Sequence, residues 1–390
     1  MEALTFNNTD LILLSVSGAL LIIQAIYYFG LYNRIHINNR AFKRGDVHFT
    51  QELPPLSVII SARNDSENLR KFLPAILEQD YPDFEVIVIN DGSTDESETL
   101  LNSLEDKYHH LYHSFTPEDS KYISRKKLAL TLAIKASKHN WLVLTEANCQ
   151  PASNQWLRLM ARNFTSRTEV VLGYSGYEAG KGWLHRRVAF DSLFTSLSYL
   201  GWALAGKPYM GLGRNMAYRK ELFFNNKGFS AHLNLQRGDD DLFINQVAKG
   251  SNTRVETDVN ATMRMQPIEY YKDWKEERVS YMATSRYYKG VQESSLKLET
   301  TTRLLFHLLF VATLVVSVLS FHWLVFGIAF IIWALRYTMQ AIIINKTATE
   351  MGEKRHYYFI LPIFDFLLPI QSLGFKLYRL YRGKSDFMRR

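Results

Sequence analysis

Three adjacent carboxylates, Asp239, Asp240 and Asp241, form the first group of residues in this sequence that could do chemistry. Because like charges this close repel one another, at least one of the three is expected to have a raised pKa, which suits a general base. A structural alternative stays open, since acidic side chains are also favourable at the amino-terminal end of a helix.

Two adjacent lysines, Lys126 and Lys127, open a predicted helix after a loop. The amino-terminal end of a helix and an ammonium group both attract phosphate. We expect one of the two, Lys126, to neutralise a diphosphate. The alternative is a basic helix end that faces solvent.

The hydrophobic pattern predicts the elements that position these groups. Short apolar, β-branched runs are typical of buried parallel strands, and helical stretches lie between them. The strands are expected at residues 56–60, 84–89 and 141–145, and the helices at about 65–79, 94–107 and 124–139. This alternation predicts an α/β fold with a doubly wound, mainly parallel sheet, whose ligand binds beyond the carboxyl ends of the strands.

The polar residues that follow these strands resemble those of the inverting family 2 glycosyltransferases, which have the GT-A fold. The resemblance covers about residues 54–290 and rests on five motifs in the family's order: LSVIISARNDSENL, VINDGSTDES, SRKKLAL, GLGRNMAYRKELF and RGDDDLFINQVAK. It implies an enzyme of hexosyltransferase type that takes a sugar from a nucleotide-diphosphate donor, expected to be a UDP-sugar.

The resemblance assigns donor contacts to four residues. Asp65 and Asp91 match positions that accept hydrogen bonds from the uracil or the ribose, and Lys126 and Arg278 would contact the diphosphate. Asp91 also precedes a glycine, and Asp-Gly is an ordinary turn signal. Arg278 lies in residues 277–281, where the family's Gln-x-x-Arg-Trp signature is altered to Glu-x-x-Ser-Tyr.

On the acceptor side, the resemblance points to Arg214, Asn215 and Tyr281. The first two lie where the family shapes its acceptor pocket, and the tyrosine is expected to stack on a sugar. The family's catalytic pattern is Glu-Asp-x-Asp-Leu. Aligning its end on Asp241 makes Asp239 the general base, with Asp240 as the alternative base.

The family's metal motif corresponds here to Glu146 and Asn148. Two oxygens at this point would hold Mg²⁺ or Mn²⁺ between the donor phosphates. The longer glutamate and the neutral amide depart from the usual pair of aspartates, so we expect weaker binding. The alternative is an ordinary strand-to-loop edge that has lost the metal.

Uncharged stretches predict membrane segments at both ends of the chain. Residues 11–32 would span ~33 Å as a helix, enough to cross a hydrocarbon core. A longer stretch is expected to form two spans, at about 304–320 and 323–344, and residues 357–375 either re-enter the membrane or form a fourth span. We therefore expect an anchor at 1–45, a glycosyltransferase domain at 46–300, and a membrane region with a basic tail at 301–390.

The charge distribution predicts the topology. Glu2 and Asp10 are the only charged residues before the first span, whereas basic residues follow it at once, so the positive-inside rule places the catalytic domain in the cytoplasm, at a bacterial inner membrane. The basic residues that flank the membrane segments also explain much of the net charge of +8 by contact with membrane lipids rather than nucleic acid. The single cysteine, Cys149, excludes an intramolecular disulfide.

Together these features predict a membrane-bound inverting glycosyltransferase of cell-envelope polysaccharide biosynthesis, acting on a lipid-linked or surface-glycan acceptor. Two alternatives remain: a processive polysaccharide synthase, and a non-catalytic nucleotide-sugar-binding membrane protein. The oligomeric state cannot be predicted from the sequence.

Overall fold

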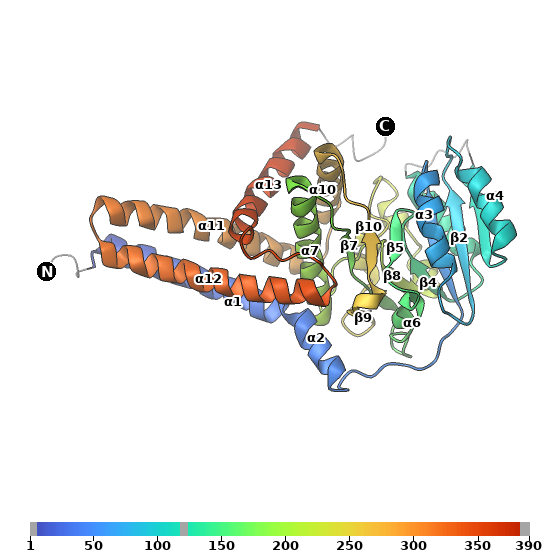
Figure 1. The fold of residues 1–390 in the computed structure, drawn as a ribbon, viewed down its shortest axis with the longest axis horizontal. Helices are drawn as coiled ribbons and strands as arrows, with labels where there is room; N and C mark the ends of the chain where they lie inside the picture. The colour runs from blue at the N-terminus through green and yellow to red at the C-terminus, as the bar shows by residue number, and fades with distance from the viewer. Residues whose placement is uncertain (1–5, 118–123, 383–390) are drawn as a thin grey trace.

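The computed structural model describes residues 6–117 and 124–382, so the predicted tail residues Lys384, Arg389 and Arg390, and Glu2 at the other end, lie outside the described residues. An α/β domain lies at one end of the molecule and a bundle of long helices projects from it (Figure 1). Helix α7 (Trp183–Leu204) lies between the two parts.

A seven-stranded sheet in the described part of the chain has the order β3-β2-β1-β4-β8-β6-β9. Its strands are β1 (Leu56–Ala62), β2 (Phe84–Asn90), β3 (Leu111–Phe115), β4 (Trp141–Leu144), β6 (Val170–Leu172), β8 (Met216–Arg219) and β9 (Thr253–Val255). Strand β1 pairs in parallel with β2 and β4, whereas β8 is antiparallel to β4 and β6. The predicted mainly parallel α/β sheet is therefore confirmed.

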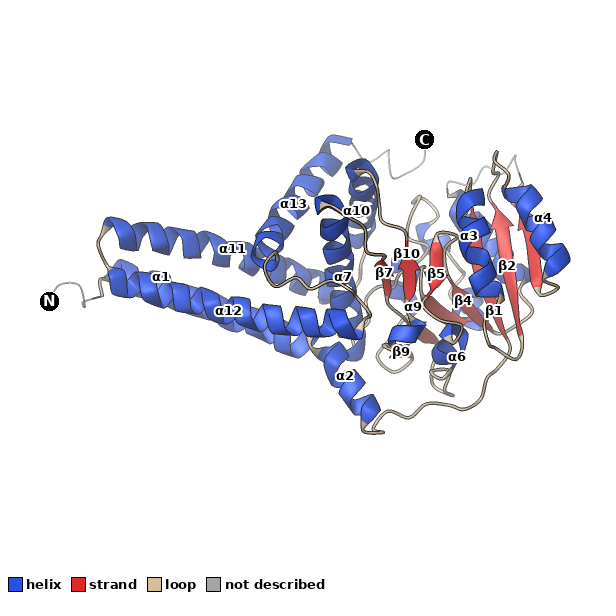
Figure 2. Cartoon of the chain, viewed as in Figure 1, coloured by secondary structure: helices blue, strands red, loops and turns tan. Residues whose placement is uncertain are grey.

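A smaller three-stranded sheet has the order β5-β10-β7, with β5 (Cys149–Pro151), β7 (Ser175–Tyr177) and β10 (Met263–Met265). The helices of the domain (blue in Figure 2) are α3 (Ser66–Leu77), α4 (Ser97–Lys107), α5 (Arg125–Ala136), α6 (Trp156–Ala161), α8 (Lys220–Asn225), α9 (Asp241–Val247) and α10 (Tyr271–Ser285). Two short 3₁₀ helices cover Ser230–His232 and Val259–Ala261.

The central strands β1, β2 and β4 are mostly apolar because hydrophobic clusters cover both faces of the sheet there. Along β1, Ile59 packs into one cluster, while Val58 and Ile60 pack into the other. The first cluster continues through α7 to Tyr28 and Tyr32 at the base of the helical bundle. One continuous core thus joins the sheet to the projecting helices.

The bundle consists of α1 (Asn8–Tyr27), which continues through a π-helical turn (Tyr28–Tyr32) into α2 (Arg34–Lys43), and of the hairpin α11 (Gln292–Leu319) and α12 (Trp323–Glu350). Among the described residues, three helical segments are long and apolar enough to cross a membrane: Asn8–Lys43, Gln292–Leu319 and Trp323–Glu350. The chain turns between α11 and α12 at the predicted residues 320–322, but α11 begins well before the predicted residue 304. The domain boundaries at 45 and 300 stay predictions.

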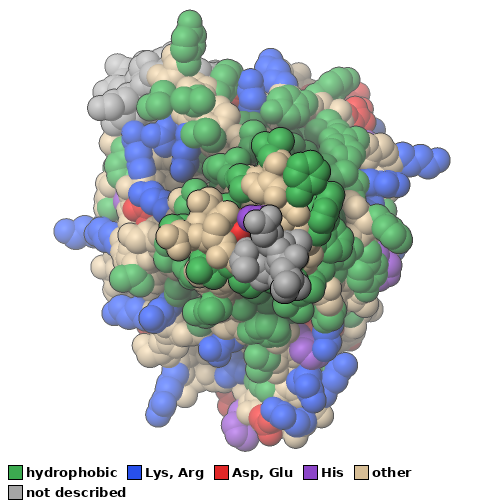
Figure 3. Space-filling model, turned by 90° about the vertical axis from the view of Figure 1, so that its left-hand side faces the viewer, with side chains coloured by type: hydrophobic (Ala, Val, Ile, Leu, Met, Phe, Trp, Pro, Cys, Tyr) green, Lys and Arg blue, Asp and Glu red, His purple; other side chains and the backbone are tan. Residues whose placement is uncertain are grey.

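The outer surface of the bundle is apolar. Large hydrophobic side chains are exposed along each helix, among them Ile12, Ile22, Val311, Val315 and Ile331. Seen from the tip of the bundle, hydrophobic side chains gather in the centre of the view, and many Lys and Arg side chains lie around its edge (Figure 3). An apolar surface of this kind is expected to face lipid rather than water.

Residues 357–375 contribute to a single helix, α13 (Leu361–Arg382), with Pro369 inside it. This helix is not among the three segments apolar enough to cross a membrane. It packs against α10 and α11 at the domain end of the bundle (Figure 1). The arrangement favours an interfacial helix, and the choice between the two predicted alternatives stays a prediction.

Candidate active site

The carboxyl ends of β1, β2 and β4 open into a cavity of about 590 Å³, which we call the strand-end cavity. Five predicted site residues line it: Asp65, Asp91, Lys126, Glu146 and Asn148. They come from separate loops, and the sheet brings them together because the ends of neighbouring parallel strands meet at one edge. The geometry thus groups the predicted donor and metal residues, apart from Arg278, in one space.

Asp91 is held in place from two sides. Its Oδ1 accepts hydrogen bonds from Thr116 Oγ1 at 2.9 Å and from Arg125 Nε at 2.9 Å. The next residue, Gly92, has φ of +67°, so the turn predicted from Asp-Gly is present as well. The turn and the site are therefore compatible, because the turn aims the Asp91 carboxylate at the cavity.

A chain of alternating charges leads from this cavity to the acidic loop. Lys126 Nζ lies 2.7 Å from Glu146 Oε1 and 3.2 Å from Asp239 Oδ2. On its other side, Glu146 Oε2 pairs with Arg214 Nε at 3.0 Å, and Arg214 Nη2 pairs with Glu277 Oε1 at 2.9 Å. Lys126 is therefore the direct link between the strand-end cavity and the predicted base.

The charge chain shifts the pKa of both members of its central pair. Burial alone would lower the pKa of Lys126, but the charges of Asp239 and Glu146 outweigh it and raise the value above its usual range. Burial alone would raise the pKa of Glu146, but Lys126 and Arg214 hold the value well below its usual range. Both groups are therefore charged at neutral pH.

The other two aspartates face a different way. Asp240 Oδ2 accepts hydrogen bonds from Gly213 N at 3.1 Å and from Tyr281 Oη at 3.0 Å, while its Oδ1 caps α9 through Asp241 N at 2.7 Å. Asp241 accepts hydrogen bonds from Thr284 Oγ1 and, at 2.7 Å, from Tyr288 Oη. Asp240 and Asp241 therefore stand at the start of α9, which is the structural alternative predicted for the acidic triplet. Asp239 instead faces Lys126.

Burial and mutual repulsion raise two of the three carboxyl pKa values. Burial first, and the charge of Asp239 second, raise the pKa of Asp240. Burial and the charge of Asp240 raise the pKa of Asp241 to about 7, against hydrogen bonds from Thr284 and Tyr288 that lower it. The expectation of at least one raised pKa in this triplet is confirmed.

Replacing Asp241 by Asn is expected to make stability less dependent on pH. The folded pKa of about 7 lies above the ordinary value of 3.8, so between these values the folded state binds more protons and loses stability as pH rises. The variant's unfolding temperature should exceed that of the wild type at about pH 8, and this advantage should vanish near pH 4. Thermal unfolding across this range measures the difference, and a pH-independent difference would contradict a buried titrating carboxyl.

The candidate metal residues offer three side-chain oxygens, two from Glu146 and one from Asn148. Glu146 and Asn148 line the same cavity, but both carboxylate oxygens of Glu146 are already paired with cations. Within residues 6–117 and 124–382, no three His, Cys, Asp or Glu side chains form a group that could hold a metal ion. A hard divalent cation prefers about six oxygen ligands, so it would fit here only with most of its ligands supplied by a bound phosphate compound and by water.

The structure corrects two predictions. Asn215 is only 1% exposed, and its amide bonds to Trp156 Nε1, to Tyr174 O and to Ala261 O, so it braces the core and does not reach an acceptor. Arg278 does not line the strand-end cavity. Its Nε pairs with Asp191 Oδ2 at 3.1 Å and its Nη1 donates to Thr195 Oγ1 on α7, so it faces α7 and not the cavity that holds the other predicted donor residues.

Sequence reasoning missed three residues. Arg237, close to the acidic triplet, and Arg125, next to Lys126, both line the strand-end cavity. Both lie inside motifs that carry the family resemblance, RGDDDLFINQVAK and SRKKLAL, and this position could have identified them. Glu277 anchors Arg214, and the sequence marked it only as an altered signature residue. Lys127, by contrast, is buried and donates to His232 O and Leu235 O, so it holds the loop before the acidic triplet.

Comparison with known proteins places this site in a family context. Residues 57–225 match the family model "Glycosyl transferase family 2". The poly-β-1,6-N-acetyl-D-glucosamine synthase of Staphylococcus epidermidis is 27% identical over 127 residues, which is 33% of this chain and 29% of that protein. Glycosyltransferase AglE of Haloferax volcanii is 33% identical over 110 residues, which is 28% of this chain and 34% of AglE. The chain thus spans roughly a third of the length of these relatives.

Among solved structures, the mannosyltransferase PcManGT from Pyrobaculum calidifontis, in complex with GDP-Man and Mn²⁺, has a TM-score of 0.53 with this chain at 15% identity. The match covers 95% of this chain and 100% of PcManGT. At this identity the likeness concerns the fold, and it supports the predicted GT-A architecture.

Proposed function

We propose that this chain, whose residues 57–225 match the family 2 glycosyltransferase model, transfers a sugar from a nucleotide-diphosphate donor, a UDP-sugar, to a hydroxyl of a lipid-linked or surface-glycan acceptor. One observation carries the proposal. The strand-end cavity, lined by the cationic residues Arg63, Arg125, Lys126 and Arg237, is joined through Lys126 to the buried carboxylate of Asp239. An anionic donor bound in this cavity would therefore lie close to the carboxylate that is proposed as the base.

In this proposal the donor lies in the strand-end cavity. The uracil and the ribose hydroxyls would donate hydrogen bonds to Asp65 and Asp91. The diphosphate would lie beside Lys126, whose fixed charge stabilises the negative charge that develops as the diphosphate leaves. Arg125 and Arg237 add positive charge to the same cavity.

Asp239 would act as the base for a single displacement with inversion. Its carboxylate takes the proton from the acceptor hydroxyl, the acceptor oxygen bonds to the anomeric carbon, and the bond to the diphosphate oxygen breaks. Asp240 is the less suitable base because three hydrogen bonds already occupy its oxygens. Tyr281 and Arg214 lie on the acceptor side of this centre.

We further propose a cytoplasmic catalytic domain on a multi-pass membrane anchor. The basic residues Arg34, Arg40, Lys43 and Arg44 lie at the domain end of the bundle, whereas the turn at residues 320–322, at the tip, has no Lys or Arg. The positive-inside rule favours this orientation.

The proposed metal, Mg²⁺ or Mn²⁺, would enter together with the donor. Glu146 and Asn148 would supply protein oxygens, the diphosphate would supply others, and the bound ion would neutralise leaving-group charge. We expect Mn²⁺ alone to leave the unfolding temperature unchanged, because Glu146 is already paired with Lys126 and Arg214. At least one UDP-sugar should raise the unfolding temperature when Mn²⁺ is added.

A thermal-shift screen of nucleotide-sugars, each with and without Mn²⁺, tests both the donor site and the metal site that is shared with the donor. No response to any donor would count against the proposed function. A full response to Mn²⁺ without nucleotide would contradict the shared metal site while leaving the donor site intact.

The similarity to the poly-β-1,6-N-acetyl-D-glucosamine synthase favours a second candidate, a processive polysaccharide synthase. Mass spectrometry of the products separates the two. A single added sugar supports the first candidate, and a ladder of lengths supports the second.

A further inference from the structure

A second cavity, which we call the helix-side cavity, has a volume of about 230 Å³ and lies between the acidic loop and the bundle. Its lining includes Arg214, which pairs with Glu146 and Glu277, and Tyr281, which donates a hydrogen bond to Asp240. The lining also includes Tyr32 and Leu296, which belong to the segments apolar enough to cross a membrane. The cavity therefore connects the proposed reaction centre with the region expected at the lipid surface.

The charged residues of this cavity are balanced in pairs. Arg214 pairs with Glu277 at 2.9 Å, Arg278 pairs with Asp191 at 3.1 Å, and Arg303 pairs with Glu299. Three cations thus face three carboxylates, and every arginine that lines the cavity already has an anionic partner. The strand-end cavity differs, because four cationic side chains line it with only three carboxylates.

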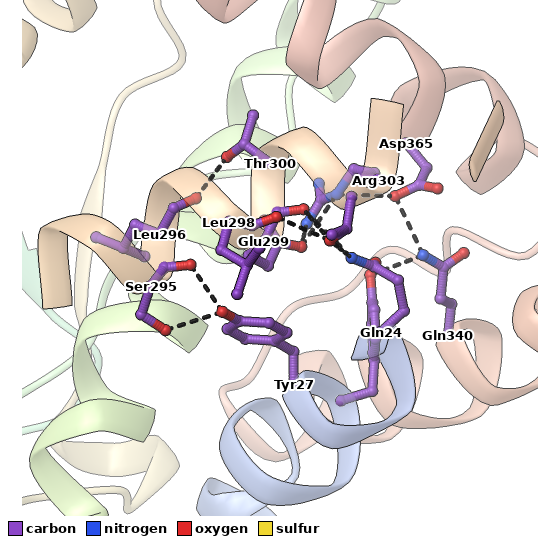
Figure 4. A network of polar contacts seen from close by, with 12 residues as sticks. Gln24, Tyr27, Ser295, Leu296, Leu298, Glu299, Thr300, Arg303, Gln340 and Asp365 are labelled. Atoms are coloured by element: carbon purple, nitrogen blue, oxygen red, sulfur yellow. Dashed lines mark hydrogen bonds and ion pairs between the residues drawn. The ribbon is translucent and has the colours of Figure 1, made fainter. Parts of the chain in front are cut away.

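The polar network at the base of the bundle keeps Arg303 occupied (Figure 4). Arg303 Nε also lies 3.5 Å from Asp365 Oδ1 on α13, and Asp365 Oδ1 accepts a hydrogen bond from Gln340 Nε2 at 3.1 Å. On the other side, Gln24 Nε2 donates to Glu299 O at 3.2 Å. The network ties α1, α11, α12 and α13 together, so Arg303 cannot turn toward a new anion without breaking several buried contacts.

The remaining lining is neutral. Hydroxyl groups are plentiful, and apolar and aromatic side chains fill the spaces between them. The hydroxyls include those of Ser192, Ser198, Thr300 and Ser372; the first three already bond within the protein, but a hydroxyl oxygen can still accept a hydrogen bond from a ligand. Hydroxyls suit an uncharged, hydroxyl-bearing head group, and an aromatic face such as that of Trp274 suits a sugar ring. A phosphate would instead need an unpaired cation, and none of the described residues that line this cavity supplies one.

We propose that the helix-side cavity binds the acceptor, and that the acceptor is an electrically neutral lipid with a free hydroxyl, such as a glycolipid, rather than a lipid phosphate. The inference rests on the proposed function and narrows its acceptor class. The acceptor hydroxyl gives its proton to Asp239 and its oxygen bonds to the anomeric carbon, while the nucleotide diphosphate leaves with the electron pair of the broken bond.

Two acceptors with the same hydrocarbon chain test the charge of the acceptor. The full chain in lipid nanodiscs receives a radiolabelled donor and either farnesyl glucoside or farnesyl phosphate. We expect at least about tenfold higher kcat/KM for the neutral acceptor. Equal use of both, preference for the phosphate, or transfer to neither while the donor is still hydrolysed would overturn the inference. Absence of donor turnover in every assay would instead overturn the proposed function.

Two variants test the location of the acceptor. Ser372→Trp on α13 fills the cavity and should raise the acceptor KM by about tenfold or more, whereas Leu373→Trp, at a residue that is exposed and outside the cavity, should not. Asp191→Asn frees Arg278 and should shift the acceptor preference toward farnesyl phosphate. Equal KM values for both tryptophan variants, or an unchanged preference in Asp191→Asn, would contradict the assignment of this cavity.

Discussion

The Asp239→Asn variant is expected to lose sugar transfer by about 10²- to 10⁴-fold in kcat while it still binds the nucleotide. Asn has nearly the same shape but cannot accept the proton of the acceptor hydroxyl. The residue is 3% exposed and its carboxylate lies 3.2 Å from Lys126 Nζ, so the substitution also removes one of the two anions that hold the ammonium. Steady-state kinetics with the best donor from the screen measure the loss, and calorimetric titration with UDP measures binding.

Asp240→Asn provides the comparison for this variant. Because Asp240 is occupied by Gly213, Tyr281 and the start of α9, its replacement should reduce kcat much less than that of Asp239. Equal donor turnover in the wild type and in Asp239→Asn would exclude Asp239 as the base. A larger loss in Asp240→Asn would transfer the role to its neighbour.

The Lys126→Met variant is expected to lower kcat by about 10²- to 10³-fold and to weaken UDP binding, because the diphosphate loses its nearest fixed cation. The buried Asp239 and the half-buried Glu146 would also keep their negative charges without the ammonium, which lies 3.2 Å and 2.7 Å from them. The same kinetic and calorimetric measurements apply.

Lys135→Met is the matched control, since Lys135 is an exposed residue near the other end of α5. It should leave kcat and UDP affinity unchanged. If Lys126→Met kept wild-type affinity for UDP, the diphosphate could not lie beside Lys126, and the proposed donor position would be wrong.

The strands and their polar ends could be predicted from the sequence because the signal is local. The apolar run of β1 shows the burial of both sheet faces directly, and parallel topology then requires that the carboxyl ends meet. Asp65, Asp91 and Glu146 are placed by this logic alone. No long-range contact has to be known to expect them in one cavity.

The direction of a side chain outside the strands could not be predicted in the same way. Asn215 directly precedes β8, and its amide is held in the core by three partners that are distant in the sequence, Trp156, Tyr174 and Ala261. Arg278 follows Glu277 on α10, and successive residues of a helix point about 100° apart. Glu277 and Tyr281 therefore face the charge chain and the acidic loop, while Arg278 turns toward Asp191 on α7.

A structure of the protein with UDP and Mn²⁺ bound is the most direct test of the central claim. We predict that the uridine lies against Asp65 and Asp91, with its diphosphate beside Lys126 and Glu146 in the strand-end cavity. A nucleotide bound outside that cavity, or with its diphosphate turned away from Lys126 and Asp239, would contradict the proposed enzyme.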